Sequence, residues 1–195
     1  MNKRNLEATK TSLLTATERL MTKCAEPAQV TSRAIAREAG VNQAMINYCF
    51  GSREALLYAA FEKMQAEAQR SNPAFEQILR ENISPKQKLI ELYCASVKMI
   101  LKHLPYIRAV TKYALLTRSI TSGKTFSFVK EYYAGERTDG ECRLVAYEIS
   151  SLHELAVLRH EELKEVCGID LTNEIEMRKF VETHINMLLD GREVK

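Results

Sequence analysis

Histidine and cysteine serve most often as nucleophiles, proton carriers and metal ligands, and their spacing in this 195-residue chain favours none of these roles. The four histidines include no H-x-x-x-H pair and have no cysteine partner at the spacing of a zinc site. The five cysteines are dispersed without a C-x-x-C pair, which favours reduced thiols over disulfides. No Ser/His/Asp set, pair of catalytic carboxylates or phosphate-binding loop stands out. The sequence therefore predicts a protein that is not an enzyme and has no metal or cofactor.

A different pattern of residues, between 32 and 50, has the chemistry of DNA recognition. Two short helices that cross steeply need a small residue at the crossing, here Ala36, and a glycine at the turn, here Gly40. Ile35, Ala39, Val41 and Ile46 then supply a small apolar core. The polar side chains of Gln43, Asn47 and Tyr48 fall on the opposite side, where a recognition helix offers groups to base edges and phosphates. The alternative, two ordinary short helices in a bundle, leaves this polar pattern unexplained.

The elements that must position these residues are all predicted to be helices. Thr31 or Ser32 is a suitable N-cap for a helix over about 32–39, and Asn42 for one over about 43–49. The helical period also predicts segments at about 5–23 and 52–70, and then at 74–82, 85–103, 105–119, 125–136, 140–158 and 172–190, with a short turn near 161–167. No strand-like alternation persists, so the fold class is all-α.

The excess positive charge lies in the first third of the chain. Residues 1–70 contain ten Lys and Arg against seven Asp and Glu, whereas the remaining residues contain 18 of each. A net positive charge is expected of a segment that faces DNA. An uneven distribution of surface charge that has no function would give the same excess. No apolar run approaches the roughly 20 residues of a membrane-spanning helix, and no signal peptide is recognisable. We expect a cytoplasmic protein without a membrane partner.

Residues 10–65 resemble the TetR family of transcriptional regulators. The matching segments read Leu-Leu-Thr-Ala-Thr at 13–17, Thr-Ser-Arg-Ala-Ile-Ala-Arg-Glu-Ala-Gly-Val at 31–41 and Phe-Gly-Ser-Arg-Glu-Ala-Leu at 50–56. The resemblance implies an N-terminal three-helix DNA-binding domain with a helix-turn-helix, over 1–52, and a larger helical effector-binding and dimerisation domain, over 53–195. The helix at 53–70 would connect the two domains. The tyrosine common in the family's recognition helix falls at Asn47, so no operator preference follows from the resemblance.

The resemblance also implies roles for individual residues. Residues at the start of the supporting helix, on the recognition helix and at the start of the fourth helix are expected to contact DNA: Thr31, Ser32, Arg33, Gln43, Ala44, Met45, Asn47, Tyr48 and Arg53. Arg53 would touch a phosphate at a helix N-terminus, where an anion is favoured. Cys49, near this surface, has two readings: a small filler beneath the helix, or a redox switch. The first is favoured, since no resolving cysteine is evident.

Two features of the second part bear on regulation. Aromatic residues cluster there, and Tyr113, Phe126 and Tyr147 are expected to line a pocket for a small-molecule effector, although core packing explains each of them equally well. Broad apolar faces on the helices at 140–158 and 172–190 predict a homodimer with a four-helix interface. A two-fold dimer suits a palindromic operator in double-stranded DNA.

These observations predict a sequence-specific DNA-binding regulator, a homodimeric repressor that responds to a ligand. Two alternatives stay open at this point. One is a regulator without a ligand, controlled by a protein partner, and the other is a helical enzyme or binding module whose helix-turn-helix is purely structural. The identity of the effector and the operator sequence do not follow from the residues.

Overall fold

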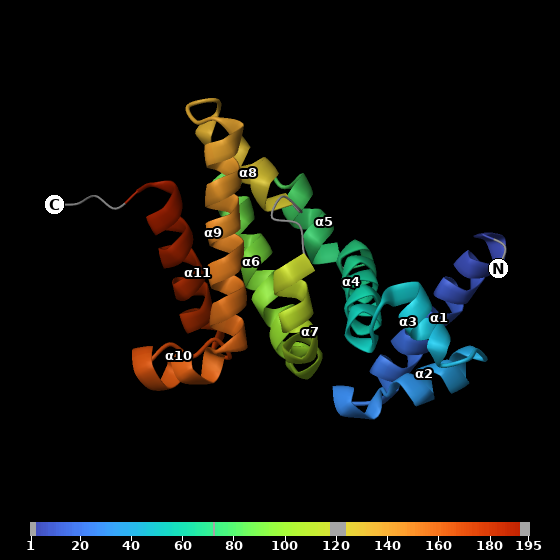
Figure 1. Ribbon diagram of the computed structural model, residues 1–195. Helices are drawn as coiled ribbons and strands as arrows, with labels where there is room; N and C mark the ends of the chain where they lie inside the picture. Colours follow the sequence, from blue (N-terminus) through green and yellow to red (C-terminus); the bar gives the residue numbers. More distant parts are fainter. Residues whose placement is uncertain (1–2, 72, 118–123, 192–195) are drawn as a thin grey trace. The chain divides into compact units, whose positions relative to one another are not determined.

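The computed structural model describes residues 3–71, 73–117 and 124–191, and within these ranges every regular element is a helix (Figure 1). The elements in chain order are α1 (Lys3–Lys23), the 3-10 turn η1 (Pro27–Gln29), α2 (Ser32–Ala39), α3 (Ala44–Phe50), α4 (Arg53–Ser71), α5 (Pro73–Arg80), α6 (Pro85–Lys102), α7 (Leu104–Thr117), α8 (Lys124–Tyr133), α9 (Asp139–Leu158), α10 (His160–Cys167) and α11 (Glu174–Leu189). The expected all-α fold is confirmed.

The chain packs into two compact units. The first contains α1 to α4 together with α7 from Pro105 onward, and the second contains α5, α6 and α8 to α11. The division expected from the sequence, after residue 52, therefore differs from the division by packing. Helix α4 packs on α1 and α3 and belongs wholly to the first unit.

In the first unit, α1 packs against α2, α3 and α4. The fully buried side chains at the centre are Leu13, Val30, Ile35, Ile46, Leu56 and Leu57. Each contributes about 1.5–3 kcal/mol by leaving water, so this small core fixes how the short helices cross. An ion pair with Lys63 Nζ 2.7 Å from Glu18 Oε1 also joins α4 to α1.

In the second unit, α9 packs against α8, α6, α11 and α10, and α6 packs against α8 and α11 (Figure 1). The core is apolar along these helices, with Leu89, Val97, Val129, Ile149, Val157, Val181 and Ile185 all buried. The Tyr93 hydroxyl lies 2.9 Å from Thr125 Oγ1 and 2.8 Å from Ser150 Oγ, so buried polar groups of α6, α8 and α9 satisfy one another.

Two predicted segments were wrong in extent. Helix α8 ends at Tyr133 rather than near residue 136, because Ala134 and Gly135 have positive φ angles of 47° and 94°, which no α-helix contains. The segment expected as a short turn near 161–167 is the helix α10, closed by Gly168 in the left-handed conformation. The predicted end of the helix at 105–119 lies partly outside the described residues.

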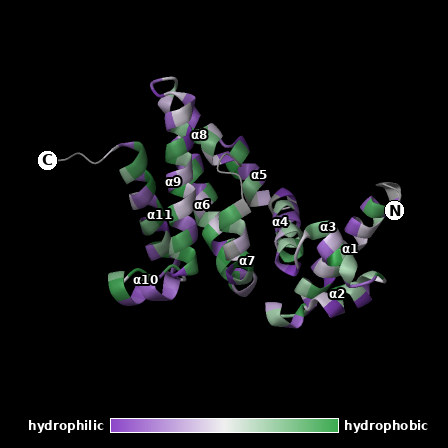
Figure 2. Cartoon of the chain, viewed as in Figure 1, coloured by the Kyte–Doolittle hydropathy of each residue, from purple (hydrophilic) through white to green (hydrophobic). Residues whose placement is uncertain are grey.

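Hydrophilic and hydrophobic residues are mixed along the helices of both units (Figure 2). In the part of the chain that the structure describes, no helix combines the length and the apolar character needed to cross a membrane.

Candidate nucleic-acid interface

Helix α2 has well-defined signals at both ends. At its start, Thr31 Oγ1 accepts a hydrogen bond from the Ala34 N–H at 3.1 Å, as an N-cap residue does. At its end, Gly40 has φ 67° and ψ 30°, and the Gly40 and Val41 N–H groups donate to the carbonyls of Arg37 and Ala36. These two bonds form a Schellman motif, which reverses the chain sharply and directs it toward α3.

Helix α3 begins one residue later than expected, at Ala44. The Asn42 Oδ1 accepts from the Ala44 N–H at 2.9 Å, so Asn42 caps this first turn as predicted from its side-chain chemistry. Ile46, which is 1% exposed, anchors the helix in the core, and Gly51 ends it with φ 80°. Two short helices joined by a glycine turn give the helix-turn-helix that the spacing predicts.

The predicted recognition surface is accessible on α3. Tyr48 is 66% exposed, and Gln43, Ala44 and Asn47 are also exposed, whereas Met45 is half-buried. Positions 44, 47 and 48 share one face at helical spacing, opposite to Ile46. The Tyr48 phenol and the Asn47 carboxamide on this face can hydrogen-bond to base edges and phosphates, and the Ala44 methyl can make apolar contact with a base.

The start of α2 adds further accessible groups. Thr31 and Arg33 are exposed and Ser32 is half-buried. A threonine hydroxyl that accepts the capping bond still has its own proton to donate, and the Arg33 guanidinium adds a positive charge beside it. The first helical turn therefore offers donors of the type that phosphate contacts require.

Arg53 opens α4 as expected, and its side chain makes contacts within the protein that the sequence did not indicate. Its Nε donates to the Val30 carbonyl at 2.7 Å, its Nη2 donates to the Pro27 carbonyl, and its Nη1 lies 3.2 Å from Glu54 Oε1. The side chain is 24% exposed. All three guanidinium nitrogens thus have a partner inside the protein, and the observed role of Arg53 is to hold the chain before α2. The phosphate contact stays a prediction.

Cys49 is half-buried on α3, and burial raises the pKa of its thiol. A raised pKa leaves less thiolate at neutral pH, and the thiolate is the reactive form. This environment supports the reading of Cys49 as a filler beneath the helix.

The three expected effector-pocket residues belong to different units. The Tyr113 ring lies 5.4 Å from the Tyr58 ring in the first unit. In the second unit, the Arg143 guanidinium lies 4.1 Å from the Phe126 ring centroid, and Tyr147 is 44% exposed on α9. Packing within one unit therefore does not group the three rings, and their role as a pocket stays a prediction.

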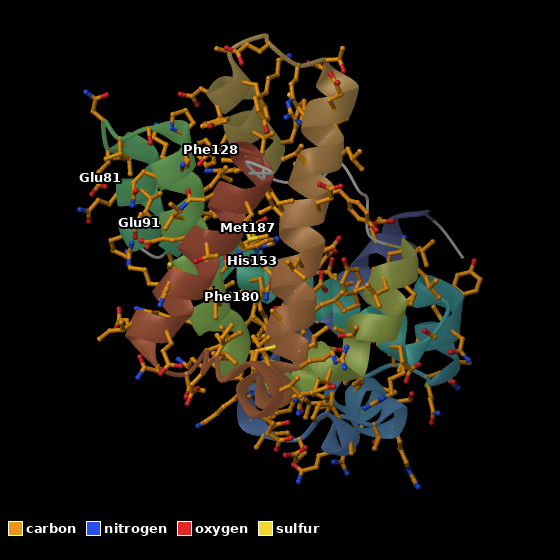
Figure 3. All side chains as sticks on the ribbon, turned by 90° about the vertical axis from the view of Figure 1, so that its left-hand side faces the viewer. Glu81, Glu91, Phe128, His153, Phe180 and Met187 are labelled. Atoms are coloured by element: carbon orange, nitrogen blue, oxygen red, sulfur yellow. The ribbon has the colours of Figure 1, made fainter. Side chains whose placement is uncertain are left out.

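The sequence did not reveal a buried pair of histidines in the second unit. His153 Nδ1 lies 3.2 Å from His184 Nδ1 and 2.8 Å from the Ile149 carbonyl oxygen, while His153 Nε2 is buried without a partner. In Figure 3 the labelled His153 and Phe180 lie near each other, and their rings are 5.8 Å apart. The available signal was spacing, because His153 follows the core residue Ile149 by one helical turn.

Within the described ranges, no three His, Cys, Asp or Glu side chains come together as metal ligands. Burial lowers the pKa of both imidazoles to about 4, so both are neutral at pH 7.

Comparison with known proteins agrees with this geometry. Residues 13–60, from α1 to the first half of α4, match the family model described as bacterial regulatory proteins, tetR family. No curated protein matches the chain.

Proposed function

The chain belongs to the tetR family of bacterial regulatory proteins and is a DNA-binding transcriptional regulator, and from this premise we propose that it is a homodimeric repressor that responds to a small molecule. The proposal includes the cytoplasm as its location, since the regulator must reach the chromosome, and it includes the absence of any enzymatic activity.

The observation that carries the proposal is the exposed face of α3. A tyrosine that is 66% exposed beside an exposed asparagine and glutamine has no role in the core of the unit. Donors and acceptors held on a short rigid helix suit direct readout in the major groove, where each base pair has its own pattern of groups. We assign base contacts to Gln43 and Asn47 and a phosphate contact to Tyr48.

The outer face of α9 supports the dimer. Leu144, Tyr147, Leu152 and Leu155 are all at least 44% exposed, whereas Ile149 and Ala156 on the other face are buried. The exposed residues recur at helical spacing, so they form one apolar stripe, here called the α9 stripe, rather than isolated contacts with solvent. Exposed apolar stripes of this kind mark interaction surfaces. A second copy of the chain is the occupant that a two-fold operator requires, because one helix-turn-helix reads only a half-site.

The ligand response requires a molecule that binds one spacing of the two DNA-binding units more tightly than another. An apolar or amphipathic molecule suits the second unit, whose interior is apolar with a few polar groups on Tyr93, Thr125 and Ser150. Phe126 and Tyr147 are candidate contacts in this unit.

The experiment combines three measurements on the purified full-length chain. A duplex is first selected from a random pool by repeated binding, and the mass of the complex is then measured by sedimentation. The same duplex is placed in a promoter for transcription in vitro. We expect two chains on a palindromic duplex and reduced transcript. A single chain on the duplex would contradict the dimer, increased transcript would contradict the repressor, and failure to select any sequence would contradict the whole proposal.

A further inference from the structure

The loop between α1 and α2 is fastened by two side chains that lie far away in sequence. Arg53 of α4 donates to the carbonyls of Val30, at 2.7 Å, and Pro27. The Tyr106 hydroxyl of α7 donates to the Cys24 carbonyl at 2.7 Å, across 82 positions of sequence. Three carbonyls of one loop are therefore held by two side chains, and this arrangement is here called the loop clamp.

The loop has few other constraints. Its backbone hydrogen bonds are short-range, from Gln29 N to Glu26 O, from Val30 N to Pro27 O and from Thr31 N to Gln29 O, all near 3.0–3.1 Å. Such bonds keep η1 folded but do not fix its position on the unit. Arg53 and Tyr106 supply that position from α4 and α7, and the buried side chains of Pro27 and Val30 add to it.

Tyr106 comes from an unexpected part of the chain. Helix α7 follows α6 directly, and Leu104 is buried in the core of the second unit. Tyr106 and Ile107, two and three residues later, are buried, and packing groups both with the first unit. The unit that contains the helix-turn-helix is thus completed by a helix that begins more than 30 residues after α4 ends at Ser71.

We propose that Arg53 and Tyr106 are positioning residues for DNA binding, and that the DNA-binding unit of this chain is discontinuous and requires α7. The loop clamp ends at Val30, and the next residues, Thr31 to Arg33, cap and open α2. Fixing the loop fixes where these donors lie relative to α3. The part of this proposal that concerns DNA binding rests on the proposed function. The loop clamp itself rests only on contacts within the free chain.

The chemistry of each side chain suits a clamp. Burial raises the pKa of the Tyr106 hydroxyl, so it stays protonated and donates at every physiological pH. The planar arginine fork presents nitrogens in fixed directions and spans two carbonyls at once, which a lysine ammonium on a flexible stem does not reproduce. Arg53→Lys therefore separates two roles: it keeps the positive charge that a phosphate contact needs and removes the geometry that the clamp needs.

The experiment uses Tyr106→Phe, Arg53→Lys and the matched control Tyr132→Phe. The control loses the same atom from the second unit, where the Tyr132 hydroxyl donates to Asp190 Oδ1 at 2.6 Å. Hydrogen exchange of the peptide covering residues 27–36 is measured on the free full-length proteins. Affinity is then measured for a duplex that the unmodified protein selects from a random pool. Thermal unfolding checks that each variant is folded.

We expect faster hydrogen exchange at 27–36 in both clamp variants. The exchange rate in the control variant should equal that of the unmodified protein. Affinity should fall about 2- to 12-fold for Tyr106→Phe and more than about 10-fold for Arg53→Lys, the ranges for losing a neutral and a charged hydrogen bond. A double variant that combines Tyr106→Phe with Arg53→Lys should show non-additive losses of affinity, because both side chains hold one loop.

Unchanged exchange at 27–36 in both variants overturns the clamp, whatever the DNA result. Unchanged affinity and exchange in Arg53→Lys assign Arg53 to phosphate instead and overturn its positioning role. Faster exchange with unchanged affinity shows a clamp that does not serve DNA binding and also overturns the proposal. If no duplex is selected at all, the proposed function fails, and the exchange data still decide whether the clamp exists.

Discussion

The Nδ1 atoms of His153 and His184 lie 3.2 Å apart inside the second unit, and only one of them can carry a proton. His153 Nδ1 is also 2.8 Å from the Ile149 carbonyl oxygen, which only accepts, so this nitrogen is the protonated one. His184 Nδ1 must then present a lone pair. A second proton between the two rings would place two N–H groups against each other, and the pair is stable only when both imidazoles are neutral.

Acid should therefore destabilise the protein through this pair. Burial lowers the pKa of each imidazole from 6.5 to about 4, so between these values the unfolded chain binds more protons than the folded one. Stability is fully present above pH 6.5 and is lost as the pH falls toward 4, by up to about 1.4 kcal/mol per pH unit for each histidine.

Urea unfolding at pH 7 and pH 5 measures this loss in the unmodified protein and in His153→Leu. The variant removes one titrating group and the buried Nε2 that has no partner, so its loss of stability between the two pH values should be smaller. Equal losses in the two proteins would show that the pair does not control the acid response.

The exposed residues of α3 and of the turn before it should divide into two classes. Tyr48→Ala is expected to weaken binding to specific and random DNA alike, because a phosphate contact is independent of sequence. Gln43→Ala is expected to lose discrimination at one base-pair position by about 1–3 kcal/mol. Binding to a set of single-base operator variants measures both effects. The division is wrong if the two variants lose specific and random binding to the same extent.

Gly40 should be costly to replace, because its backbone lies in the left-handed region. A Cβ at this position meets no atom within 4 Å, so the penalty of Gly40→Ala comes only from the backbone φ of 67° and is about 1–2 kcal/mol. Gly140 in the first turn of α9 has no positive φ, and its Cβ would lie 3.9 Å from Thr138 Oγ1. Gly140→Ala should stabilise the protein by about 0.4–1 kcal/mol. Chemical unfolding compares the two, and equal effects would contradict the Schellman geometry.

The α9 stripe should control assembly. Leu152→Glu places a charge in the middle of the stripe on a side chain that is 45% exposed, so the fold of the single chain should tolerate it while the dimer does not. Val166→Glu on α10, at a residue that is 76% exposed, is the control. Sedimentation velocity should show that Leu152→Glu is monomeric, whereas Val166→Glu remains a dimer. A Leu152→Glu protein that still sediments as a dimer would place the interface elsewhere.

Local signals made most of the first unit predictable. Thr31, Gly40 and Asn42 are capping and turn residues whose structural effect is confined to a few neighbours, and each has the role in the structure that its type predicts. The exposed side of α3 followed in the same way from the burial of Ile46. Helix α10 was underestimated because none of its residues is buried, so its sequence has no apolar stripe anchored in a core.

Contacts between residues far apart in the chain could not be predicted from the sequence. Nothing near Tyr106 shows that its hydroxyl bonds the Cys24 carbonyl, and a basic residue such as Arg53 at the start of a helix has the same local pattern whether it faces a phosphate or two carbonyls. The domain boundary predicted after residue 52 also differs from the packing, since α4 and α7 are grouped with the first unit. Only contacts between distant residues define that grouping.

The most direct test of DNA-binding regulation is a titration of the purified protein against the DNA that flanks its own gene, with random DNA as competitor, at two salt concentrations. A DNA-binding regulator predicts selective binding with a two-fold footprint, weakened by salt and by Tyr48→Ala. Binding that is absent or non-selective, to this DNA and to every duplex from a random pool, would contradict regulation through sequence-specific DNA binding.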